Sequence, residues 1–388
     1  MMYTPPKRKT KVVFVQLGSP VEPTPKALRK YLRDFLGDPR VIDLPRWKWN
    51  IILNCFVLPF RPKKSARLYE RIWDGKSFPL ITNTENFTEK VRSELKIIDP
   101  DGYVEVNHAF LLSPPYVNEV YDSWEQDIKD GCGATKLMVI PMFPQYSEST
   151  IASGVDALAK ELSRRVKIPT FEVITNFHRT HAFVDNFARR IDEKVIALRT
   201  EQTQIDRLVV SFHGMQKRRI TSKGDDYYRH CYETFRLIVD RLKELPRDRA
   251  LMTFQSRFGS EEWITPYTEQ VVEGLVEKGD AEILVCSPSF VVDCLETTDE
   301  LGYELVNDAK EWGANVHTVD CLNVDEQWCR DFAKYTLTQA EGSAQDKEDI
   351  EYILKPEDYQ AMPPLSLGDD GFQRAMEATS FESIGSQP

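Results

Sequence analysis

The sequence predicts an α/β protein made of two doubly wound, Rossmann-like parallel-sheet lobes with an interlobe cleft. Four short runs of β-branched and apolar residues end in or lead into Gly, Pro or Ser, at residues 11–17, 136–141, 207–212 and 282–286. Apolar runs without alternation are typical of parallel strands that helices cover on both faces. A length of 388 residues allows two domains, and a hydrophobic content of 41% can fill two cores.

Amphipathic helices are expected between the strands, at residues 25–35, 85–97, 117–129 and 228–245. A faint internal repeat supports two lobes. The strings KVVFVQLG and RLVVSFHG both join a strand to a glycine, and their alignment places Leu17 opposite His213. The alternative is that any two α/β domains share such strand endings.

The expected domains are an N-terminal lobe at residues 1–185, with an apolar pocket lip at 46–62, and a C-terminal lobe at 186–336. Residues 337–388 are expected to form an acidic, flexible extension, because Gly, Ser, Pro and acidic residues dominate them. From residue 340 onward, eleven acidic and three basic residues contribute −8 of the total charge of −11. The 50 basic residues are outnumbered by 61 acidic ones, so no nucleic-acid partner, which would need clustered positive charge, is expected.

The cysteine pattern and the start of the chain favour a cytoplasmic protein. The seven cysteines are odd in number, scattered and without a C-x2-C pair, which is typical of reduced thiols rather than of a disulfide framework or a zinc ribbon. The start MMYTPPKRKT leads into the first strand without an apolar h-region, so no signal peptide is expected. No uncharged apolar run approaches the roughly 18 residues that a membrane-spanning helix needs.

His213 stands apart among the six histidines because it directly follows a predicted strand and precedes Gly214. The strand holds the residue rigidly, and the glycine allows the backbone to turn. The imidazole is therefore expected at the carboxyl end of the sheet, where α/β proteins bind their ligands. The alternative is a histidine that caps the strand and bonds a neighbouring loop.

Four acidic residues follow the last of these strands on a helix expected at residues 291–312. Asp293, Glu296, Glu300 and Glu304 are spaced i, i+3, i+7 and i+11, which places them within about 60° of one another on an α-helix. Carboxylates this close can relay protons or hold divalent ions. The alternative is a solvated helix face.

The segment WKWNIILNCFVLPF at residues 47–60 is apolar and has cations on both sides, Arg46 before it and Arg61, Lys63 and Lys64 after it. It is too short to span a bilayer, and tryptophans beside cations are typical of an interfacial anchor or of the lip of an apolar pocket. An ordinary core helix is the alternative. No P-loop, G-x-G-x-x-G or G-x-S-x-G motif occurs, which argues against nucleotide-driven and serine-hydrolase chemistry.

Six stretches of the sequence match a known enzyme family in the family's own order. They are VVFVQLGSPVEPTPKALRKYLRDFLGDPRVID, LPRWKWNIILNCFVLPFRPKKSARLYERIWDGKSFPL, FPQYSESTIASG, SFHGM, FQSRFGSEEWITPYT and SPSFVVDCLETTDEL. Over roughly residues 10–336 the chain resembles the proteobacterial-type ferrochelatases, which insert ferrous iron into protoporphyrin in the last step of haem biosynthesis.

The resemblance implies a metal chelatase, a lyase, with Fe2+ and protoporphyrin IX as substrates. His213 of the S-x-H-G motif and Glu296 of the D-x-x-E-T motif would be its catalytic and metal-binding residues, with Asp293 and Glu300 as a proton or metal relay. We expect His213 to accept the pyrrole protons and Glu296 to handle the metal, and the reversed roles stay open. The implied porphyrin-binding residues are Leu17, Tyr146, Ser147, Trp263 and Phe290.

The sequence departs from the family's motifs at four places. Gln216 and Asp226 stand where S-x-H-G-x-P and G-D-P-Y have proline, Ser289 stands where P-G-F has glycine, and AFLLSPP at residues 109–115 replaces an M-R-Y-G-type segment. These departures concern the pocket's shape and its preferred porphyrin. Two alternatives stay open: a cobalt or nickel chelatase of a sirohydrochlorin-type ring, and a non-catalytic porphyrin- or haem-binding protein.

Some family members bind a [2Fe–2S] cluster through a cysteine-rich C-terminus, and this chain has no cysteine after Cys329. An internal cluster would have to draw on Cys132, Cys286, Cys294, Cys321 or Cys329. The resemblance to a bacterial-type enzyme implies a cytoplasmic protein in peripheral contact with the inner membrane through residues 47–60. The motifs favour protoporphyrin over coproporphyrin, and the sequence leaves both a monomer and a homodimer open.

Overall fold

The computed structural model describes residues 9–129, 134–342, 350–363 and 365. The chain forms two compact units: unit 1 is Met1–Asn176 with Asn323–Gln345, and unit 2 is Phe177–Leu322 with Asp346–Pro388. Each unit has its own four-stranded sheet, and every strand pairing in both sheets is parallel. The predicted α/β class with two parallel sheets is confirmed.

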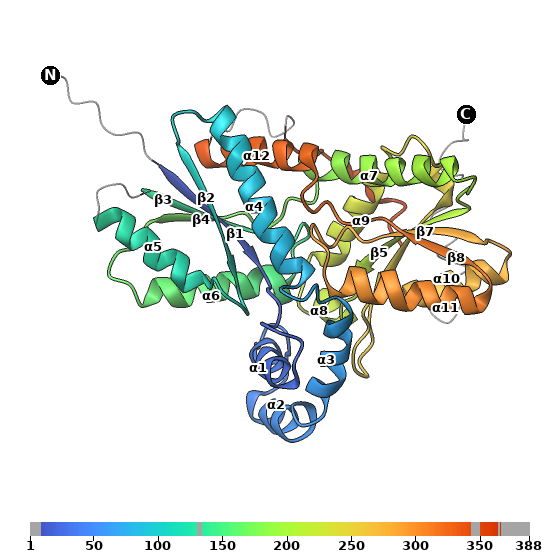
Figure 1. The fold of residues 1–388 in the computed structure, drawn as a ribbon, viewed down its shortest axis with the longest axis horizontal. Coiled ribbons are helices and arrows are strands. Elements are labelled where there is room, and N and C mark those ends of the chain that lie inside the picture. The colour runs from blue at the N-terminus through green and yellow to red at the C-terminus, as the bar shows by residue number, and fades with distance from the viewer. Residues whose placement is uncertain (1–8, 130–133, 343–349, 364, 366–388) are drawn as a thin grey trace. The chain divides into compact units, whose positions relative to one another are not determined.

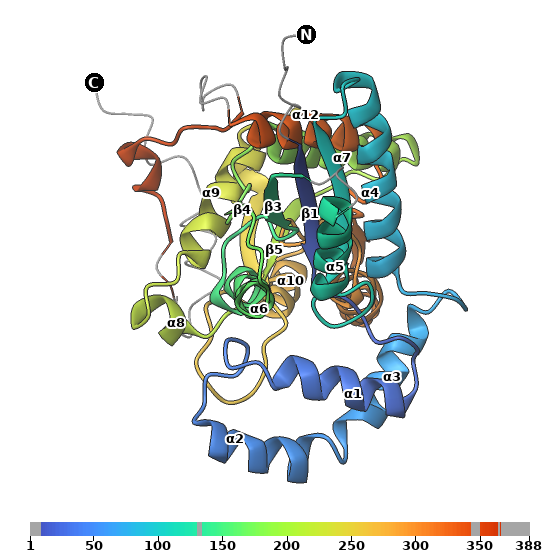
Figure 2. The same ribbon diagram turned by 90° about the vertical axis from the view of Figure 1, so that its left-hand side faces the viewer.

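The sheet of unit 1 has the strand order β2-β1-β3-β4. Its strands are β1 (Thr10–Gln16), β2 (Val104–Phe110), β3 (Lys136–Pro141) and β4 (Thr170–Val173). Helices α4 (Pro79–Ile98) and α12 (Glu326–Glu341) pack on one side of β1 and β2, and α5 (Val117–Lys129) packs on the other side together with α6 (Ser153–Ser163), as Figures 1 and 2 show.

Strand β1 is apolar throughout because helices cover both of its sides. Phe14 points toward α4 and α12, and its ring centroid lies 5.6 Å from that of Phe332 on α12. Val13 and Val15 point the opposite way, into a cluster with Trp124 of α5. Helix α12 therefore belongs to the core of unit 1, although it follows unit 2 in the sequence.

Three further helices of unit 1 lie beyond the carboxyl end of β1 (Figures 1 and 2). They are α1 (Pro25–Leu36), α2 (Arg46–Ile52), which continues as the π-helical η1 (Leu53–Val57), and α3 (Arg61–Arg71). They share a small core of their own in which Trp49 and Leu53 are buried with the apolar side of α1. Among the described residues, no helix combines the length and hydrophobicity that crossing a bilayer requires.

The sheet of unit 2 has the order β6-β5-β7-β8. Its strands are β5 (Arg207–His213), β6 (Ala250–Gln255), β7 (Glu282–Cys286) and β8 (Asn315–Thr318). Its longer helical segments are α7 (His181–Thr200), α8 (Lys217–Thr221), α9 (Tyr227–Val239), α10 (Thr268–Glu277), the π-helical η4 (Glu296–Leu305) and α11 (Val306–Trp312), and two 3-10 helices, η3 (Arg247–Arg249) and η6 (Pro356–Tyr359), complete them.

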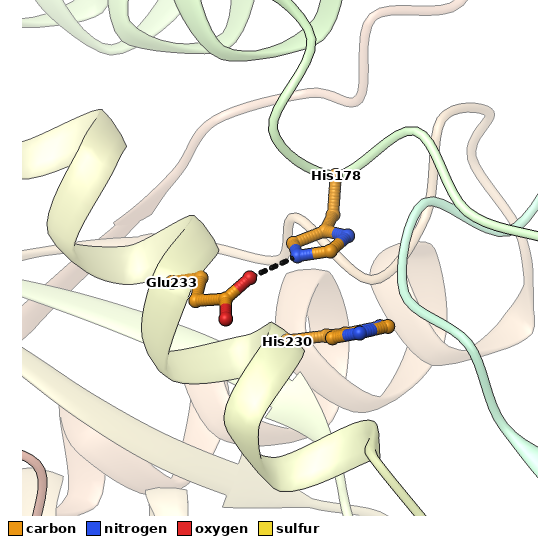
Figure 3. Close-up of side chains that lie close together, drawn as sticks. All are labelled: His178, His230 and Glu233. Carbon is orange, nitrogen blue, oxygen red and sulfur yellow. Dashed lines mark hydrogen bonds and ion pairs between the residues drawn. The ribbon is translucent and has the colours of Figure 1, made fainter. Parts of the chain in front are cut away.

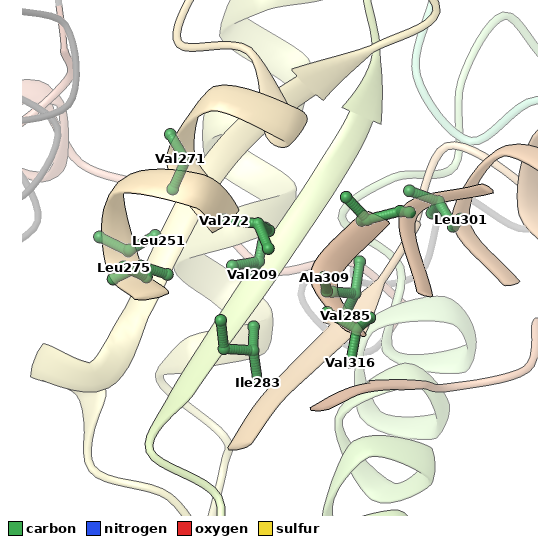
Figure 4. Packing of buried hydrophobic residues seen from close by; sticks show 11 residues of the cluster. Val209, Leu251, Val271, Val272, Leu275, Ile283, Val285, Leu301, Ala309 and Val316 are labelled. Carbon is green, nitrogen blue, oxygen red and sulfur yellow. The ribbon is translucent and has the colours of Figure 1, made fainter. Parts of the chain in front are cut away.

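The main apolar cluster of unit 2 joins its central strands to α10, η4 and α11 (Figure 4). Val209 of β5 and Val285 of β7 face Val272 of α10 and Leu301 of η4 in this cluster. Helix α9 packs on β6, and α7 packs on α9. Burial from both sides explains why β5 and β7 lack hydrophobic alternation.

The predicted lobes and the compact units end at different residues. The expected second lobe was 186–336, whereas unit 2 begins at Phe177 and α12 lies in unit 1. The physical reason is that the apolar side of α12, with Trp328 and Phe332, packs against the ring of Phe87 in α4. No periodicity within α12 could show on which sheet that side is buried.

The prediction of a flexible extension at residues 337–388 was wrong for two parts of it. Residues 337–341 complete α12, and residues 350–363 and 365 make hydrogen bonds with unit 2. Residues 343–349, 364 and 366–388 lie outside the described residues. The helix expected at 291–312 begins only at Leu295.

Candidate active site

His213 is the last residue of β5, and three hydrogen bonds hold it there. Its backbone N–H donates to Oγ of Ser289 at 3.1 Å, and its carbonyl accepts from the hydroxyl of Tyr227 at 2.8 Å. Its ring Nδ1 lies 2.8 Å from the carbonyl oxygen of Gly214. Because a carbonyl oxygen can only accept, Nδ1 carries a proton, and in the neutral ring the lone pair is on Nε2.

The turn after His213 requires glycine. The N–H of Gly214 donates to the carbonyl oxygen of Gln255 at 2.7 Å. A Cβ at this position would lie 2.7 Å from that same oxygen and 3.0 Å from Cε3 of Trp263, both closer than ordinary packing allows. Trp263 therefore packs directly on the turn. Phe290 flanks it as well, since its ring centroid lies 6.3 Å from that of His213 in an edge-on arrangement.

The four predicted acidic residues do not all lie on one helix. Asp293 precedes the helix, and its carboxylate accepts hydrogen bonds from the hydroxyl of Thr297 at 2.9 Å and the N–H of Cys321 at 3.3 Å. Glu296, Glu300 and Glu304 lie on η4, whose i→i+5 hydrogen bonds differ from those of the expected α-helix. The single α-helical ladder from Asp293 to Glu304 was therefore wrong. The tertiary contacts of Asp293, rather than helical spacing, fix its place.

Glu300 occupies an environment that favours a proton near neutrality. Its Oε2 accepts hydrogen bonds from the hydroxyl of Ser256 at 2.5 Å and from Nε2 of Gln255 at 3.4 Å. Burial, followed by the nearby charge of Glu296, raises the pKa of Glu300 to about 7, although these hydrogen bonds lower it. Its carboxyl group can therefore take up and release a proton under physiological conditions.

Gln255, at the end of β6, connects the histidine to the acidic helix. Its carbonyl holds Gly214, its Oε1 accepts from the hydroxyl of Ser211 at 2.7 Å, and its Nε2 donates to the carbonyl of Glu296 at 3.1 Å. Four residues that position the site were not predicted as site residues, although each lies within or beside a motif quoted from the sequence. They are Tyr227, Gln255, Ser256 and Ser289.

The predicted site residues of unit 1 gather at the carboxyl edge of its own sheet. Leu17 directly follows β1, and its carbonyl accepts from the N–H of Leu112 at 3.0 Å. Tyr146 and Ser147 follow β3, which pairs with β1 in parallel. Ser147 is buried and caps the π-helical η2 (Glu148–Ala152), because its hydroxyl accepts from the N–H of Ser149 at 3.2 Å. The structure thus brings these three residues to one edge.

The predicted pocket lip has one buried side and one exposed side. Trp49 and Leu53 are buried, whereas Trp47 is 66% exposed, Phe56 66% and Phe60 72%. The exposed side therefore carries aromatic rings beside the cations already noted in the sequence. The interpretation as an ordinary core helix was wrong for this side of α2 and η1.

His178, His230 and Glu233 form a second cluster of titratable groups in unit 2 (Figure 3). Two imidazoles and a carboxylate are a donor set that divalent metals accept. Here, however, Nε2 of His178 lies 2.6 Å from Oε2 of Glu233, and Nη1 of Arg229 lies 2.6 Å from Oε1 of Glu233. The two imidazole rings are stacked, with centroids 4.0 Å apart. The geometry favours a hydrogen-bonded cluster over a metal site.

Comparison with known proteins gives a consistent result. A family model described as Ferrochelatase matches residues 9–340. A ferrochelatase from Idiomarina loihiensis is 40% identical over 296 residues, which are 76% of this chain and 78% of that protein. A ferrochelatase from Herminiimonas arsenicoxydans is 36% identical over 327 residues, 84% of this chain and 85% of that protein. The solved structure of SirB from Bacillus subtilis with Fe3+ has a TM-score of 0.47 at 13% identity, over 86% of this chain and 98% of that one, which is too distant to carry an argument.

The cluster of His178, His230 and Glu233 predicts that the free energy of unfolding falls in acid. Burial, with the neighbouring His178, lowers the pKa of His230 to about 2, whereas an unfolded histidine titrates near 6.5. Between these values the unfolded chain binds more protons, so stability falls as the pH drops below 6.5, by about 1.4 kcal/mol per pH unit for each histidine kept neutral. Replacing His230→Gln should therefore reduce the loss between pH 7 and pH 5 by about 2 kcal/mol, measured by urea unfolding.

The matched control for this measurement is His317→Gln, which changes a partly exposed histidine on β8. This variant should keep the acid sensitivity of the parent protein. An unchanged pH dependence in His230→Gln would show that His230 takes up its proton without cost in the folded state.

Proposed function

The chain belongs to the ferrochelatase family, and from that premise we propose how its own residues carry out the reaction. The protein is a metal chelatase, a lyase that inserts Fe2+ into protoporphyrin IX in haem biosynthesis. We propose that His213 accepts the pyrrole protons and that Glu296 handles the metal. The family assignment favours this reaction over a cobalt or nickel chelatase and over a non-catalytic porphyrin-binding protein.

Metal insertion faces three obstacles. Two pyrrole N–H protons must leave, the hydrated ion must lose its water, and the flat macrocycle must bend to expose its nitrogen lone pairs. A neutral imidazole can accept protons, and a carboxylate can hold the ion or pass protons onward. Apolar walls can hold the macrocycle in a bent shape, so that binding energy is used for strain.

The free lone pair on Nε2 of His213 is the observation that supports the assignment of the base. Its partner atom Nδ1 donates to the carbonyl of Gly214, which fixes the tautomer in which Nε2 can accept a proton. Ser289 and Tyr227 hold the backbone on both sides of the ring. This chain therefore uses Ser289, its departure from the family's P-G-F motif, to bond the base.

The proposed proton and metal path runs along the acidic residues. Glu296 begins η4, and Glu300 lies one turn further along it. The raised pKa of Glu300 allows it to pass a proton onward near pH 7. We propose that Asp293 supports the relay by shaping the loop before the helix. Its Oδ1 accepts hydrogen bonds from the hydroxyl of Thr297 and the N–H of Cys321.

We propose that Trp263 and Phe290 of unit 2, and Leu17, Tyr146 and Ser147 of unit 1, contact the porphyrin. The packing of Trp263 on Gly214 and the edge-on contact between Phe290 and His213 support the first two. The position of the other three at the carboxyl edge of their sheet supports the rest.

The described cysteines do not fit a [2Fe–2S] cluster. Cys286 lies within β7, Cys294 and Cys321 are buried elsewhere in unit 2, and Cys329 lies on α12 of unit 1. Burial raises the pKa of all four thiols, which disfavours the thiolates that a cluster requires. Cys132 lies outside the described residues, and no step of the mechanism uses a cluster.

We propose that the protein works in the cytoplasm in peripheral contact with the inner membrane. The exposed aromatic side chains of Trp47, Phe56 and Phe60, with the neighbouring Arg46 and Lys48, support an interfacial anchor. Both the porphyrin and the haem product are apolar, so a membrane surface is a suitable source and destination for them.

The assignment of the base predicts that His213→Ala abolishes turnover. Loss of a positioned proton acceptor lowers the rate by about a hundredfold or more. Porphyrin binding should persist because the side chains proposed to contact the macrocycle are unchanged. The measurement is anaerobic formation of metalloporphyrin from Fe2+, or from Zn2+ as a surrogate, followed by absorbance. His317→Ala is the control and should keep normal turnover. Normal turnover in His213→Ala would refute the assignment.

The acidic path predicts a pH-dependent effect at Glu300. The carboxyl group loses its proton as the pH rises through about 7, so a limb of the kcat profile should rise there. Glu300→Gln should remove this limb and lower kcat at pH 8 by about tenfold. Glu304→Gln, which changes the exposed glutamate of the same helix, is the control. A profile that keeps the limb in Glu300→Gln would exclude the relay.

The membrane proposal predicts weaker vesicle binding when aromatic rings are removed. In the double variant Trp47→Ser with Phe56→Ser, binding to vesicles of phosphatidylcholine and phosphatidylglycerol should fall by about tenfold or more. The matched control is Val166→Ser with Phe171→Ser, which removes exposed apolar side chains elsewhere in unit 1. Equal cosedimentation of both double variants would contradict the proposal.

A further inference from the structure

Residues 350–363 and 365, here called the C-terminal strap, run along unit 2 beyond the family match, which ends at residue 340. The strap begins against the segment before α7. The N–H of His181 donates to the carbonyl of Ile350 at 3.0 Å, and the N–H of Tyr352 donates to the carbonyl of Arg179 at 2.9 Å. The hydroxyl of Tyr352 also donates to Asp185 at 2.6 Å.

One side of α9 contacts the strap. Tyr228, Tyr232 and Arg236 are spaced i, i+4 and i+8, so they lie on one face of the helix. The hydroxyl of Tyr228 donates to the carbonyl of Pro363 at 2.8 Å, and that of Tyr232 donates to the carbonyl of Asp358 at 3.0 Å. Arg236 pairs with the carboxylate of Asp358 at 2.7 Å. Helix α9 therefore contacts the strap along its length.

The second cluster of unit 2 anchors the middle of the strap. The side chain of Glu233 on α9 is 0% exposed, and its Oε1 accepts from the hydroxyl of Tyr359 at 2.7 Å. Burial alone would raise the pKa of Glu233, but hydrogen bonds from His178 and Tyr359 and the charge of Arg229 lower it to about 2. A permanently charged, buried carboxylate with this set of donors is costly to expose, so the contact with Tyr359 is a firm anchor.

A different face of α9 contacts the catalytic turn, because successive residues of a helix lie about 100° apart around its axis. Tyr227 is the neighbour of Tyr228 in sequence, and its hydroxyl donates to the carbonyl of His213 at 2.8 Å and lies 3.1 Å from Oγ of Ser289. The C-terminal end of the strap contacts the segment that packs on this turn. The carbonyl of Leu365 accepts from the N–H of Thr265 at 3.4 Å, and Thr265 follows the segment in which Trp263 packs on Gly214.

We propose that the C-terminal strap positions the His213 turn through α9, which makes Tyr228 and Tyr359 positioning residues for metal insertion. This inference rests on the proposed role of His213 as the base. The strap fixes the lateral position of α9, and α9 fixes the carbonyl of His213 through Tyr227. Because geometry errors of a fraction of an ångström slow a proton transfer, loosening the strap should slow the chemical step without preventing porphyrin binding.

The test uses the full chain with single hydroxyl deletions, which keep the rings and the packing. Tyr228→Phe and Tyr359→Phe should each lower kcat with Zn2+ by about fivefold, with unchanged KM for protoporphyrin and unchanged porphyrin-binding stoichiometry. Tyr352→Phe is the matched control, because its hydroxyl bonds Asp185 of α7 and not α9.

The route through Tyr227 is tested by a double-variant cycle. In a Tyr227→Phe background the link between α9 and His213 is already broken, so adding Tyr228→Phe should change kcat by less than about twofold. Additive losses in the double variant would refute this route. A loss in Tyr352→Phe as large as in Tyr228→Phe would also overturn it, because the effect would then be general.

His213→Ala separates the two hypotheses. If it abolishes turnover while Tyr228→Phe and Tyr359→Phe keep the parent kcat, the strap has no positioning role and the base assignment stands. If His213→Ala keeps normal turnover, the base assignment fails and the inference fails with it. Should Tyr359→Phe lose its circular-dichroism spectrum, the Tyr228→Phe variant and the cycle still decide the question.

Discussion

One close backbone contact underlies the candidate active site. The N–H of Gly214 donates to the carbonyl of Gln255 at 2.7 Å, and the same approach leaves no space for a Cβ. This contact ends the pairing of β5 with β6 and turns the chain directly after His213. Trp263 can then pack on the glycine, and the side-chain amide of Gln255 is free to hold the carbonyl of Glu296. A larger residue at position 214 would disturb the base, the aromatic wall and the acidic helix together.

Unit 2 contains two shielded carboxyl groups whose surroundings push their pKa values in opposite directions. Glu233 receives hydrogen bonds from His178, Arg229 and Tyr359, which keep it charged. Burial, and then the like charge of Glu296 beside it, raise the pKa of Glu300 to about 7. The first arrangement suits a permanent structural anchor, and the second suits a group that exchanges protons. Both residues are glutamates, so the difference between their pKa values follows from their surroundings and not from residue type.

The apolar helix α2 shows how limited composition is as a guide to burial. Trp49 of α2 and Leu53 of the following η1 close a small core with α1, whereas Trp47 of α2 and Phe56 of η1 are exposed. A small three-helix core cannot bury both sides of such a helix. The exposed rings and the flanking cations are the observations on which the proposed membrane contact rests.

Local strand and turn chemistry was enough to predict the parallel α/β class, the position of His213 at a strand end, and the presence of Glu296 and Glu300 after β7. The folded structure was needed to show that α12 completes unit 1, that Asp293 is outside the helix, and that Gln255 joins the histidine to the acidic residues. It also decided the course of the C-terminal strap, whose acidic, polar composition predicted flexibility. Each of these depends on partners more than 20 residues away in the chain. A pattern within one segment carries no information about such partners, since local spacing reveals which side of an element is apolar but not what will cover it.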